Sequence, residues 1–498
     1  MNKTINAIIM SATAMMAAAV PAAAADAPLI DRPDFHSASG IFDIDALEAL
    51  GRVSAPVVSP DGSKVLFGIS YESLEQNASN NDLYTLDLTA KGAQPVRLTA
   101  TPKSESGAVW FDGGRRIAFL YPAEDGTMQM WAMNADGSGR TQLSGHEGGI
   151  SGFLLSPDEK KVVVIGNVKY ARTAADLYPD LPKATGRVVD DLMYKHWDEW
   201  VTEIPHPFVG DFDGSAVSGL KDIMADEPFE APMKPFGGVE SFAWHPNSEM
   251  LVYVSRKKTG MDYALSTNSD LYLYHLATGG TRNLTEGMLG YDTMPAFSPD
   301  GHYLAWLSME RDGYESDRNR LFLLDCFTAE KRDITADWDY RIDEFAWSPD
   351  GKNIFFIAPK DGVIPVFSID VNSCAIRKLT DAVADFTSLA PVGSNKVVTM
   401  NHSMLRPNEL QLITLRGKKA PLVEQITDVN GAVFAQLKMP TVEKRMVPTT
   451  DGKQMLVWVV YPPEFDAAKK YPAILYCQGG PQSPVSQFWS YRWNLALM

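Results

Sequence analysis

The chain between residues 52 and 427 is a succession of short apolar runs separated by turn residues. The stretch from Tyr291 to Thr335 shows the pattern most fully. A Ser-Pro-Asp-Gly corner at 298–301 leads into an apolar run at 303–307, a charged break at 310–313, a second run at 320–325 and a closing Arg-Asp-Ile-Thr at 332–335. In the corner, Pro presets φ, Asp can bond back to the backbone and Gly accepts a positive φ. The pattern therefore predicts three or four short antiparallel strands joined by tight turns.

The same corner recurs along the chain, in close copies and in degenerate ones. Seven corners begin at residues 59, 110, 156, 245, 298, 348 and 391. Their spacing is 43 to 53 residues except for one interval of 89 residues. A closing motif, which is a polar residue, Leu or Ile, and then Thr or Ser, recurs at 97–99, 142–144, 283–285, 378–380 and 425–427. A single unit cannot bury both faces of its sheet, so the copies must stack, and seven of them predict a seven-bladed β-propeller over residues 26–440.

The interval of 89 residues indicates a large insertion in the third blade, near residues 167–236. It contains the segment Asp-Asp-Leu-Met-Tyr-Lys-His-Trp-Asp-Glu-Trp at 190–200. Long excursions from a blade project from one face of the disc and often carry the binding function. A structural cap over a blade edge is the competing interpretation, and the residues alone leave both open.

The pattern changes after Pro440. Two apolar runs at 445–447 and 455–461 flank the turn Asp451-Gly452. The run at 471–477 is almost continuously apolar, as expected of a strand buried on both faces of an α/β sheet, and Cys477 should then be buried. Gln-Gly-Gly-Pro follows at 478–481. Residues 441–498 therefore read as the start of a second, α/β domain.

The first 25 residues have the features of a secretory signal peptide. Lys3 precedes an apolar run from Ile5 to Val20, and small residues lead to Ala25. We expect cleavage after Ala25, and a periplasmic or secreted protein without a membrane anchor, because no other stretch approaches ~20 apolar residues. A short helix is expected at 45–50, with Asp45 and Glu48 as its capping pair.

The formal charge of −17, with lysines and arginines scattered along the sequence, argues against binding to nucleic acids and anionic membranes. Three cysteines do not make a disulfide framework. We find no metal-ligand spacing and no phosphate-binding glycine loop, so we expect no cofactor and no metal.

A propeller followed by Lys-Tyr-Pro at 470–472 and a run ending in Gln-Gly-Gly-Pro resembles the prolyl oligopeptidase (S9) family of serine peptidases. Within that family, residues 194–200 and 471–493 are most similar to bacterial dipeptidyl peptidases. The resemblance implies a mainly β fold, in which the propeller caps an α/β-hydrolase domain. It also implies an exported peptidase that releases dipeptides from the free N-terminus of short peptides, with Ala or hydrophobic P1 residues. A homodimer is compatible with this resemblance.

The sequence departs from the family pattern in one respect. α/β-Hydrolases carry the nucleophile on a Gly-x-Ser-x-Gly elbow after the oxyanion loop, and such a motif is absent from these 498 residues. We therefore expect the Ser/Asp/His triad to lie beyond Met498 and the 498-residue chain alone to be inactive. The alternative is a non-catalytic periplasmic propeller scaffold that binds peptides or proteins.

Two sets of site residues follow from the resemblance. The oxyanion loop would be formed by Gln478, Gly479 and Gly480, whose backbone can approach a substrate closely. A dipeptidyl peptidase also needs an anion for the substrate's ammonium group, and the acids of the insertion are the candidates. Two tryptophans beside them would exclude water and could contact the cation, although they could instead pack the insertion onto the disc while the acids face solvent. The candidate residues of this second set are Trp197, Asp198, Glu199, Trp200 and, one turn on if the segment is helical, Glu203.

Overall fold

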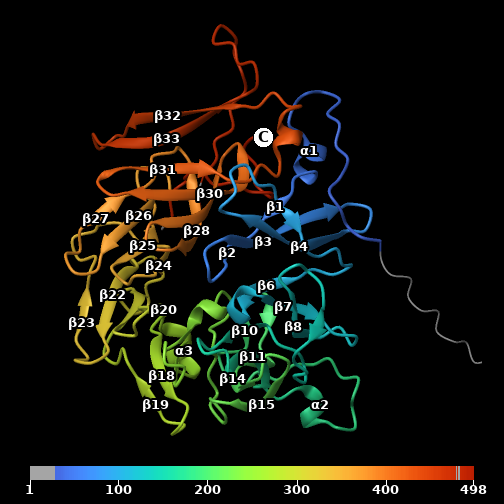
Figure 1. The fold of residues 1–498 in the computed structure, drawn as a ribbon, viewed down its shortest axis with the longest axis vertical. Coiled ribbons are helices and arrows are strands. Elements are labelled where there is room, and N and C mark those ends of the chain that lie inside the picture. The colour runs from blue at the N-terminus through green and yellow to red at the C-terminus, as the bar shows by residue number, and fades with distance from the viewer. Residues whose placement is uncertain (1–27, 478, 480–482) are drawn as a thin grey trace, which may run out of the picture.

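The structure, a computed structural model, describes residues 28–477, 479 and 483–498. Over these residues the chain forms a ring of seven antiparallel sheets, as the seven corners predict (Figure 1). The signal peptide expected at 1–25 lies outside the described residues. Within the part of the chain that the structure describes, no helix is both long and apolar enough to span a membrane.

The seven sheets follow one another in chain order. Blade one contains β1 (Arg52–Val53), β2 (Val57–Val58), β3 (Lys64–Ser73), β4 (Ala78–Asp87) and β5 (Val96–Arg97), and blade two contains β6 (Ser106–Phe111), β7 (Arg116–Pro122), β8 (Met128–Asn134) and β9 (Thr141–Gln142). Blade three contains β10 (Gly152–Leu155), β11 (Lys161–Lys169), β14 (Glu203–Phe212) and β15 (Val217–Asp222). Blade four contains β16 (Phe242–Trp244), β17 (Met250–Ser255), β18 (Asp270–His275) and β19 (Thr281–Asn283). Blade five contains β20 (Asp292–Phe297), β21 (Tyr303–Ser308), β22 (Arg320–Asp325) and β23 (Lys331–Asp333). Blade six contains β24 (Glu344–Trp347), β25 (Asn353–Ile357), β26 (Val366–Asp370) and β27 (Ile376–Lys378). Blade seven contains β28 (Asp385–Val392), β29 (Lys396–Ser403), β30 (Arg406–Arg416) and β31 (Lys419–Gln425).

The Ser-Pro-Asp corners share one hydrogen-bond arrangement, which explains why they recur. In blade five, the Ser298 hydroxyl donates to Asp300 Oδ1 at 2.6 Å and accepts the backbone N–H of Tyr303 at 2.9 Å. The same two bonds form at the corners beginning at 59, 156 and 348. Ser and Asp therefore satisfy the backbone of a sharp reversal between the first and second strands of the blade.

The closing motif also has a common structural role. The hydroxyl of Thr335 accepts the N–H of Leu321 at 2.9 Å and donates to Asp333 at 2.8 Å. The Thr or Ser at positions 99, 144, 285, 380 and 427 likewise accepts a backbone N–H from the start or interior of its blade's third strand. This bond satisfies a buried donor where the short outer strand has ended.

The ring closes through side chains and backbone, without exchange of a strand. Blade one takes all its strands from residues 52–97 and blade seven all of its strands from residues 385–425. Asn430 joins the two ends: its Oδ1 accepts the N–H of Gly51 and its Nδ2 donates to the carbonyl of Gly51, both at 2.8 Å. An apolar cluster packs across the same seam, including Val53, Phe67 and Leu410.

A helical layer covers this seam. It contains α1 (Ile44–Glu48) and α4 (Gly431–Phe434), and Phe42 and Phe434 stack with ring centroids 6.2 Å apart. The cap of α1 is Asp43, whose Oδ1 accepts the N–H of Ala46 at 2.9 Å. The expected pair of Asp45 and Glu48 was therefore two residues out of register.

The range predicted for the insertion includes part of blade three. Strands β14 and β15 complete that blade, so the segment that leaves it comprises residues 170–202. This excursion holds α2 (Ala174–Leu177) and a hairpin of β12 (Lys195–His196) and β13 (Glu199–Trp200). A short helix, α3 (Gly260–Leu265), projects from blade four, and two 3₁₀ turns lie at Asp112–Gly114 and Val239–Ser241.

Beyond the propeller, β32 (Thr441–Pro448) and β33 (Gln454–Tyr461) form the hairpin predicted around Asp451 and Gly452. The strand predicted at 471–477 is wrong: these residues form no strand, and Ile474 and Leu475 are 72% and 85% exposed. A strand needs a neighbour to take its hydrogen bonds, and no strand among the described residues pairs with this segment. Cys477 is accordingly exposed, contrary to expectation.

Candidate functional site

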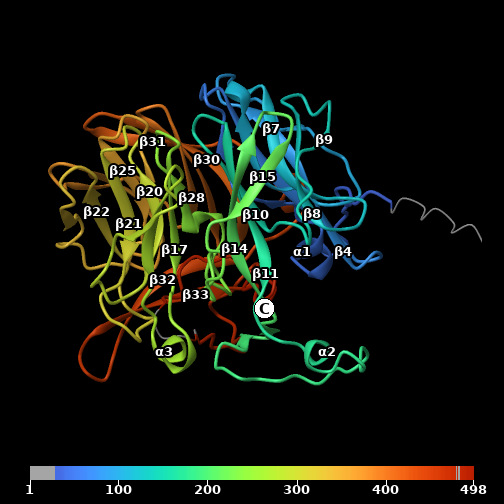
Figure 2. The ribbon, with the colours of Figure 1, turned by 90° about the horizontal axis from the view of Figure 1, so that it is seen from below.

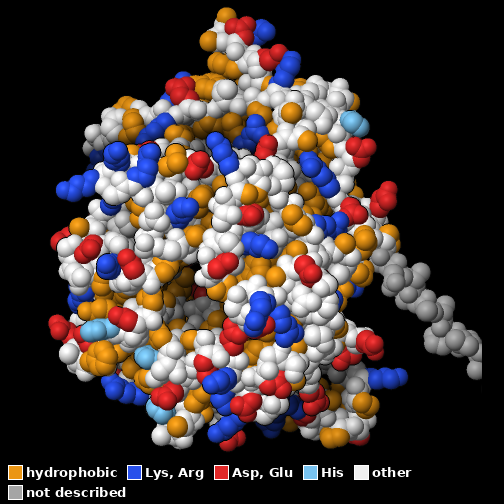
Figure 3. Space-filling view, in the orientation of Figure 1, with side chains coloured by type: hydrophobic (Ala, Val, Ile, Leu, Met, Phe, Trp, Pro, Cys, Tyr) orange, Lys and Arg blue, Asp and Glu red, His pale blue; other side chains and the backbone are white. Residues whose placement is uncertain are grey.

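One side of the ring collects most of the segments that are not blade strands. Figure 2 shows α2, α3, the β32–β33 hairpin and the C-terminal stretch on the same side of the propeller. Ser486 in that stretch donates to Asp385 Oδ2 of β28 at 2.5 Å, which fixes it to blade seven. Over the face seen in Figure 3, acidic and basic side chains are interspersed, in keeping with the scattered charges of the sequence.

The insertion presents its aromatic and acidic residues at the tip of a β-hairpin. Trp197 and Asp198 form the turn between β12 and β13, and Trp197 adopts a left-handed φ of 49°. The segment is therefore not helical, and Glu203 is not one helical turn from Glu199. Glu203 instead begins β14 in the blade, where Asn167 Nδ2 approaches its Oε2 at 3.5 Å.

The hairpin tip is exposed. Trp197 is 79% exposed and contacts Phe236 with ring centroids 6.2 Å apart, while Trp200 is 44% exposed. The guanidinium of Arg187 lies 4.4 Å from the centroid of Trp200. The side chains of Asp198 and Glu199 are exposed, and the structure places no described cation in an ion pair with either. The structure therefore brings four of the five predicted insertion residues together and leaves their carboxylates available to a cationic ligand.

A buried contact between two polar side chains joins the base of the hairpin to the propeller. Nε2 of His196 lies 2.5 Å from Oε1 of Glu230, and the two side chains are 10% and 2% exposed. The hydroxyl of Tyr263 in α3 donates to the other oxygen of Glu230 at 3.3 Å. Burial raises the pKa of Tyr263, so this hydroxyl remains a donor. We call this contact between His196 and Glu230 the hairpin latch, because it connects the tip to blade four and α3.

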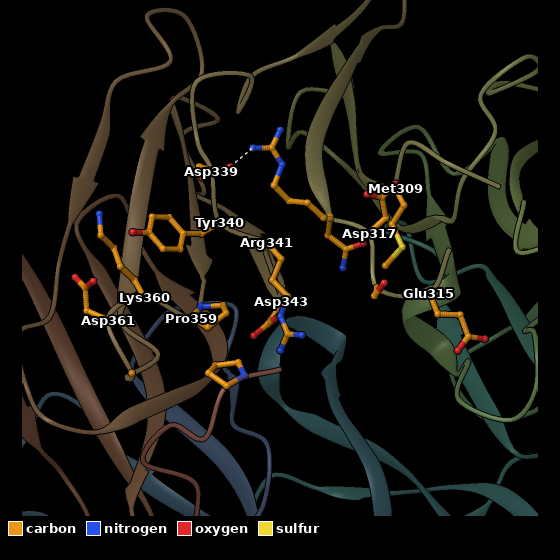
Figure 4. Close-up of a pocket in the computed structure, with 15 residues that line it drawn as sticks. Met309, Glu315, Asp317, Asp339, Tyr340, Arg341, Asp343, Pro359, Lys360 and Asp361 are labelled. Carbon is orange, nitrogen blue, oxygen red and sulfur yellow. Dashed lines mark ion pairs between the residues drawn. The ribbon is translucent and has the colours of Figure 1, made fainter. Parts of the chain in front are cut away.

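Two cavities open on this side of the ring. The first, of about 420 Å³, lies between the 309–319 loop and residues 339–343 and 359–362, and Figure 4 shows its charged side chains. Several charges there pair with each other: Arg341 with Asp343 at 2.8 Å, and Arg318 with Asp339 at 3.8 Å. Burial raises the pKa of Asp343, and neighbouring Arg341 lowers it in part.

The second cavity, of about 510 Å³, lies beside the first and shares Glu315 and Ser316 with it. Its walls come from α3, from residues 266–267 and from the 313–316 loop. Arg256, immediately after β17, also lines it.

The oxyanion loop is only partly described. Gln478 and Gly480 lie outside the described residues, and no atom of the described residues lies within 4 Å of the position that a Cβ of Gly479 would take. Among the residues that the structure describes, no cluster of His, Cys, Asp and Glu could hold a metal ion.

Sequence reasoning missed Glu230 and Arg256. Glu230 lies 34 residues from His196 in the chain, and no local motif marks it. Arg256 follows an ordinary blade strand. A useful signal would have been a buried acid within the insertion range, but burial is a property of the tertiary structure.

The sequence of this chain is similar to those of several known proteins. A family model described as TolB β-propeller domain matches residues 236–436. Dipeptidyl-peptidase 5 of Porphyromonas gingivalis is 45% identical over 449 residues, which cover 90% of this chain and 65% of that protein. Dipeptidyl-peptidase 5 of Porphyromonas endodontalis is 42% identical over 462 residues, which cover 93% and 66%. The resemblance to the prolyl oligopeptidase family is confirmed.

Solved structures agree on the fold. An acylaminoacyl peptidase in complex with Z-Gly-Gly-Phe-chloromethyl ketone superposes with a TM-score of 0.70 at 17% identity, over 91% of this chain and 64% of that one. The acylaminoacyl peptidase of Pyrococcus horikoshii gives a TM-score of 0.69 at 16% identity, over 91% and 65%. The fold is thus that of the propeller part of these structures. This chain spans just under two thirds of the length of its first curated relatives.

Proposed function

We propose that this chain supplies the propeller and adjoining segment of an exported serine-type dipeptidyl peptidase. The enzyme would release N-terminal dipeptides from short peptides, with Ala or a hydrophobic residue at P1. The observation that carries the proposal is the 45% identity to a dipeptidyl-peptidase 5 over 90% of the chain. The exposed acids of the hairpin tip, which form no ion pair with a described cation, support it. A dipeptidyl peptidase needs such an anion to bind the N-terminal ammonium group of its substrate.

The activity can be tested on the protein expressed from its complete coding sequence. We expect release of p-nitroaniline from a dipeptidyl p-nitroanilide with Ala at P1, and little release when the same substrate carries an N-acetyl group. An aspartyl P1 residue should also be a poor substrate. Binding of these peptides without turnover would favour the propeller scaffold instead.

We further propose that the hairpin tip holds the substrate's ammonium group. Asp198 and Glu199 provide negative charge, and the exposed ring of Trp197 provides an aromatic surface for a cation. Trp200 is the weaker aromatic candidate, because Arg187 already lies 4.4 Å from its ring centroid. Because these groups lie on a tip fixed by the hairpin latch, they can define how far the N-terminus reaches. Glu203 is a weaker candidate, because its carboxylate lies in the blade beside Asn167.

Single neutral substitutions test this anchor. We expect Asp198→Asn or Glu199→Gln to lower kcat/KM for free-amine dipeptidyl substrates by about 10- to 100-fold, the value of a charge-assisted hydrogen bond. Glu203→Gln should have a smaller effect. Asp180→Asn, which removes another exposed acid of the same insertion, is the matched control and should leave kcat/KM within about twofold. Parent-like kinetics of both hairpin variants would place the anchor elsewhere.

The backbone N–H groups of the 478–480 loop are proposed to stabilise the oxyanion, together with an N–H of the residue that follows the nucleophile. The open space around Gly479 is compatible with close approach of a substrate. In this proposal the hydrogen-bond donors are backbone N–H groups, so the side chain of Gln478 is not required for oxyanion binding.

A further inference from the structure

Arg256 is a half-buried arginine whose side-chain donors are only partly used. Its Nη2 donates to the hydroxyl of Tyr291 at 3.0 Å, and its Nε is buried without a hydrogen-bond partner. Among the residues that the structure describes, no acidic side chain forms an ion pair with it. An arginine has five N–H donors, so this half-buried guanidinium has more donors than partners.

The guanidinium is nevertheless held in place. Its Cζ lies 5.0 Å from the ring centroid of Tyr263 and 5.5 Å from that of Tyr291. Both distances are within the range of a cation–π contact, and Tyr263 is itself bonded to Glu230 of the hairpin latch. Arg256 is thus oriented by neutral aromatic groups that leave its charge available.

This charge faces a cavity of suitable size. Arg256 lines the cavity of about 510 Å³, together with the apolar Leu265 and the hydroxyl of Thr267. That hydroxyl accepts the N–H of Gly313 at 3.0 Å, which leaves its own proton for a further acceptor. Glu315 also contributes to the wall, but it is exposed, and solvent screens its charge more than that of half-buried Arg256.

We propose that this cavity is a binding site for a carboxylate, and that its ligand is the C-terminal carboxylate of a short peptide substrate. The planar guanidinium can donate two parallel hydrogen bonds to the two oxygens of one carboxylate, and Thr267 can add a third. The choice of a peptide rests on the proposed function. Helix α3, which lines the cavity, lies on the same side of the ring as α2 of the insertion that carries the hairpin tip (Figure 2). Such a site selects for short peptides, since it requires the C-terminus to lie a few residues from the bound N-terminus.

The experiment compares three substrates with the same two N-terminal residues, using the protein from its complete coding sequence. These are a tetrapeptide with a free carboxylate, the same tetrapeptide as its C-terminal amide, and the dipeptidyl p-nitroanilide. The parent should cleave the free acid with a kcat/KM about 10- to 100-fold above that of the amide, chiefly through KM. Arg256→Gln should lower kcat/KM for the free acid by about 10- to 100-fold and leave the other two substrates within about twofold. Arg256→Lys, which keeps the charge and loses the planar fork, should be intermediate.

Arg311→Gln is the matched control, because it removes an equal charge near the same cavity. Arg311 is already paired with Asp317 at 2.9 Å and should not affect the acid-to-amide ratio. Equal losses on all three substrates, or no loss on any, would overturn the proposal. A loss shared by acid and amide but not by the p-nitroanilide would also overturn it, because Arg256 would then bind a peptide carbonyl. If Arg256→Gln fails to fold, the acid-to-amide ratio of the parent and of Arg256→Lys decides.

The test separates this inference from the proposed function. Without turnover of any substrate, the binding of a fluorescent tetrapeptide can still be measured by anisotropy, as the free acid and as the amide. Tighter binding of the acid, lost in Arg256→Gln, would support the carboxylate site even if the protein is not a peptidase. Equal binding of acid and amide by the parent would reject it.

Discussion

Asp292 is buried at the start of β20, where its Oδ1 accepts a hydrogen bond from the indole Nε1 of Trp306 at 3.0 Å. Burial raises its pKa to about 7, and hydrogen bonds from neighbouring groups offset only part of this shift. The folded state therefore keeps a proton between about pH 4 and pH 7 that the unfolded chain, with an ordinary Asp, releases. The stability that this proton provides is fully present below the unfolded pKa and is lost as the pH rises through 7.

Replacing this carboxyl group by a neutral amide should remove that dependence. The free energy of unfolding of the parent should fall between pH 4.5 and pH 7.5, with a contribution from Asp292 on the order of 4 kcal/mol at most. In Asp292→Asn the fall should be smaller by that contribution, because the amide keeps an oxygen for Trp306 and does not ionise. Urea unfolding at four pH values measures the difference.

Asp300 in the blade-five corner provides the control. Hydrogen bonds from Ser298 and the backbone of His302 lower its pKa. Asp300 is thus ionised in both the folded and the unfolded state above pH 5. Asp300→Asn should therefore leave the pH dependence of the free energy of unfolding above pH 5 as in the parent. Identical pH profiles for the parent and Asp292→Asn would show that Asp292 does not carry the buried proton.

At the scale of elements, the β12–β13 hairpin is held by the hairpin latch and by a small apolar cluster at its base, which includes Met193 and Val201. Its strands are two residues long, so they cannot hold the tip by themselves. The hairpin latch of His196 and Glu230 supplies the polar contact to the propeller. We expect His196→Gln to loosen residues 187–203 while the propeller stays folded, because the latch lies outside the blades.

A matched pair makes this prediction specific. His206 lies 2.9 Å from Asp222 within blade three, and its side chain is as well buried as that of Glu230. His206→Gln should lower Tm and leave the rate of amide hydrogen exchange in the hairpin as in the parent. His196→Gln should instead speed hydrogen exchange and proteolytic cleavage at 187–203 and change Tm by only a few degrees. Unaltered protection of the hairpin in His196→Gln would rule out the latch.

The hairpin also shows where sequence reasoning reached its limit. The period of the corners predicted seven blades, because Ser-Pro-Asp turns and closing Thr residues form local hydrogen bonds that a sequence can encode. The aromatic and acidic segment at 194–200 was recognised as a candidate site. Its conformation was not, because two strands of two residues have no measurable alternation and depend on Glu230, which is distant in the chain. Apolar composition likewise predicted a strand at 471–477, although a strand exists only where another strand pairs with it.

The whole molecule depends on how its first and last blades meet. Blades elsewhere in the ring are joined to their neighbours by the chain itself, whereas blades one and seven meet through the apolar seam and Asn430. Asn430 is buried, and it satisfies both backbone groups of Gly51. Because the two residues are 379 positions apart, this contact forms only when the ring is closed.

Asn430→Ala should therefore weaken the contact between blades one and seven. It leaves a buried N–H and a buried C=O of Gly51 without partners, which costs about 2–4 kcal/mol in the free energy of unfolding. The loss should appear in urea unfolding and as faster hydrogen exchange in β1 and β30, before exchange rises in blades three to five. Asn372→Ala, in an exposed turn of blade six, should change neither quantity. If Asn430→Ala were as stable as Asn372→Ala, the hydrogen bonds of Asn430 would not contribute to closure of the ring.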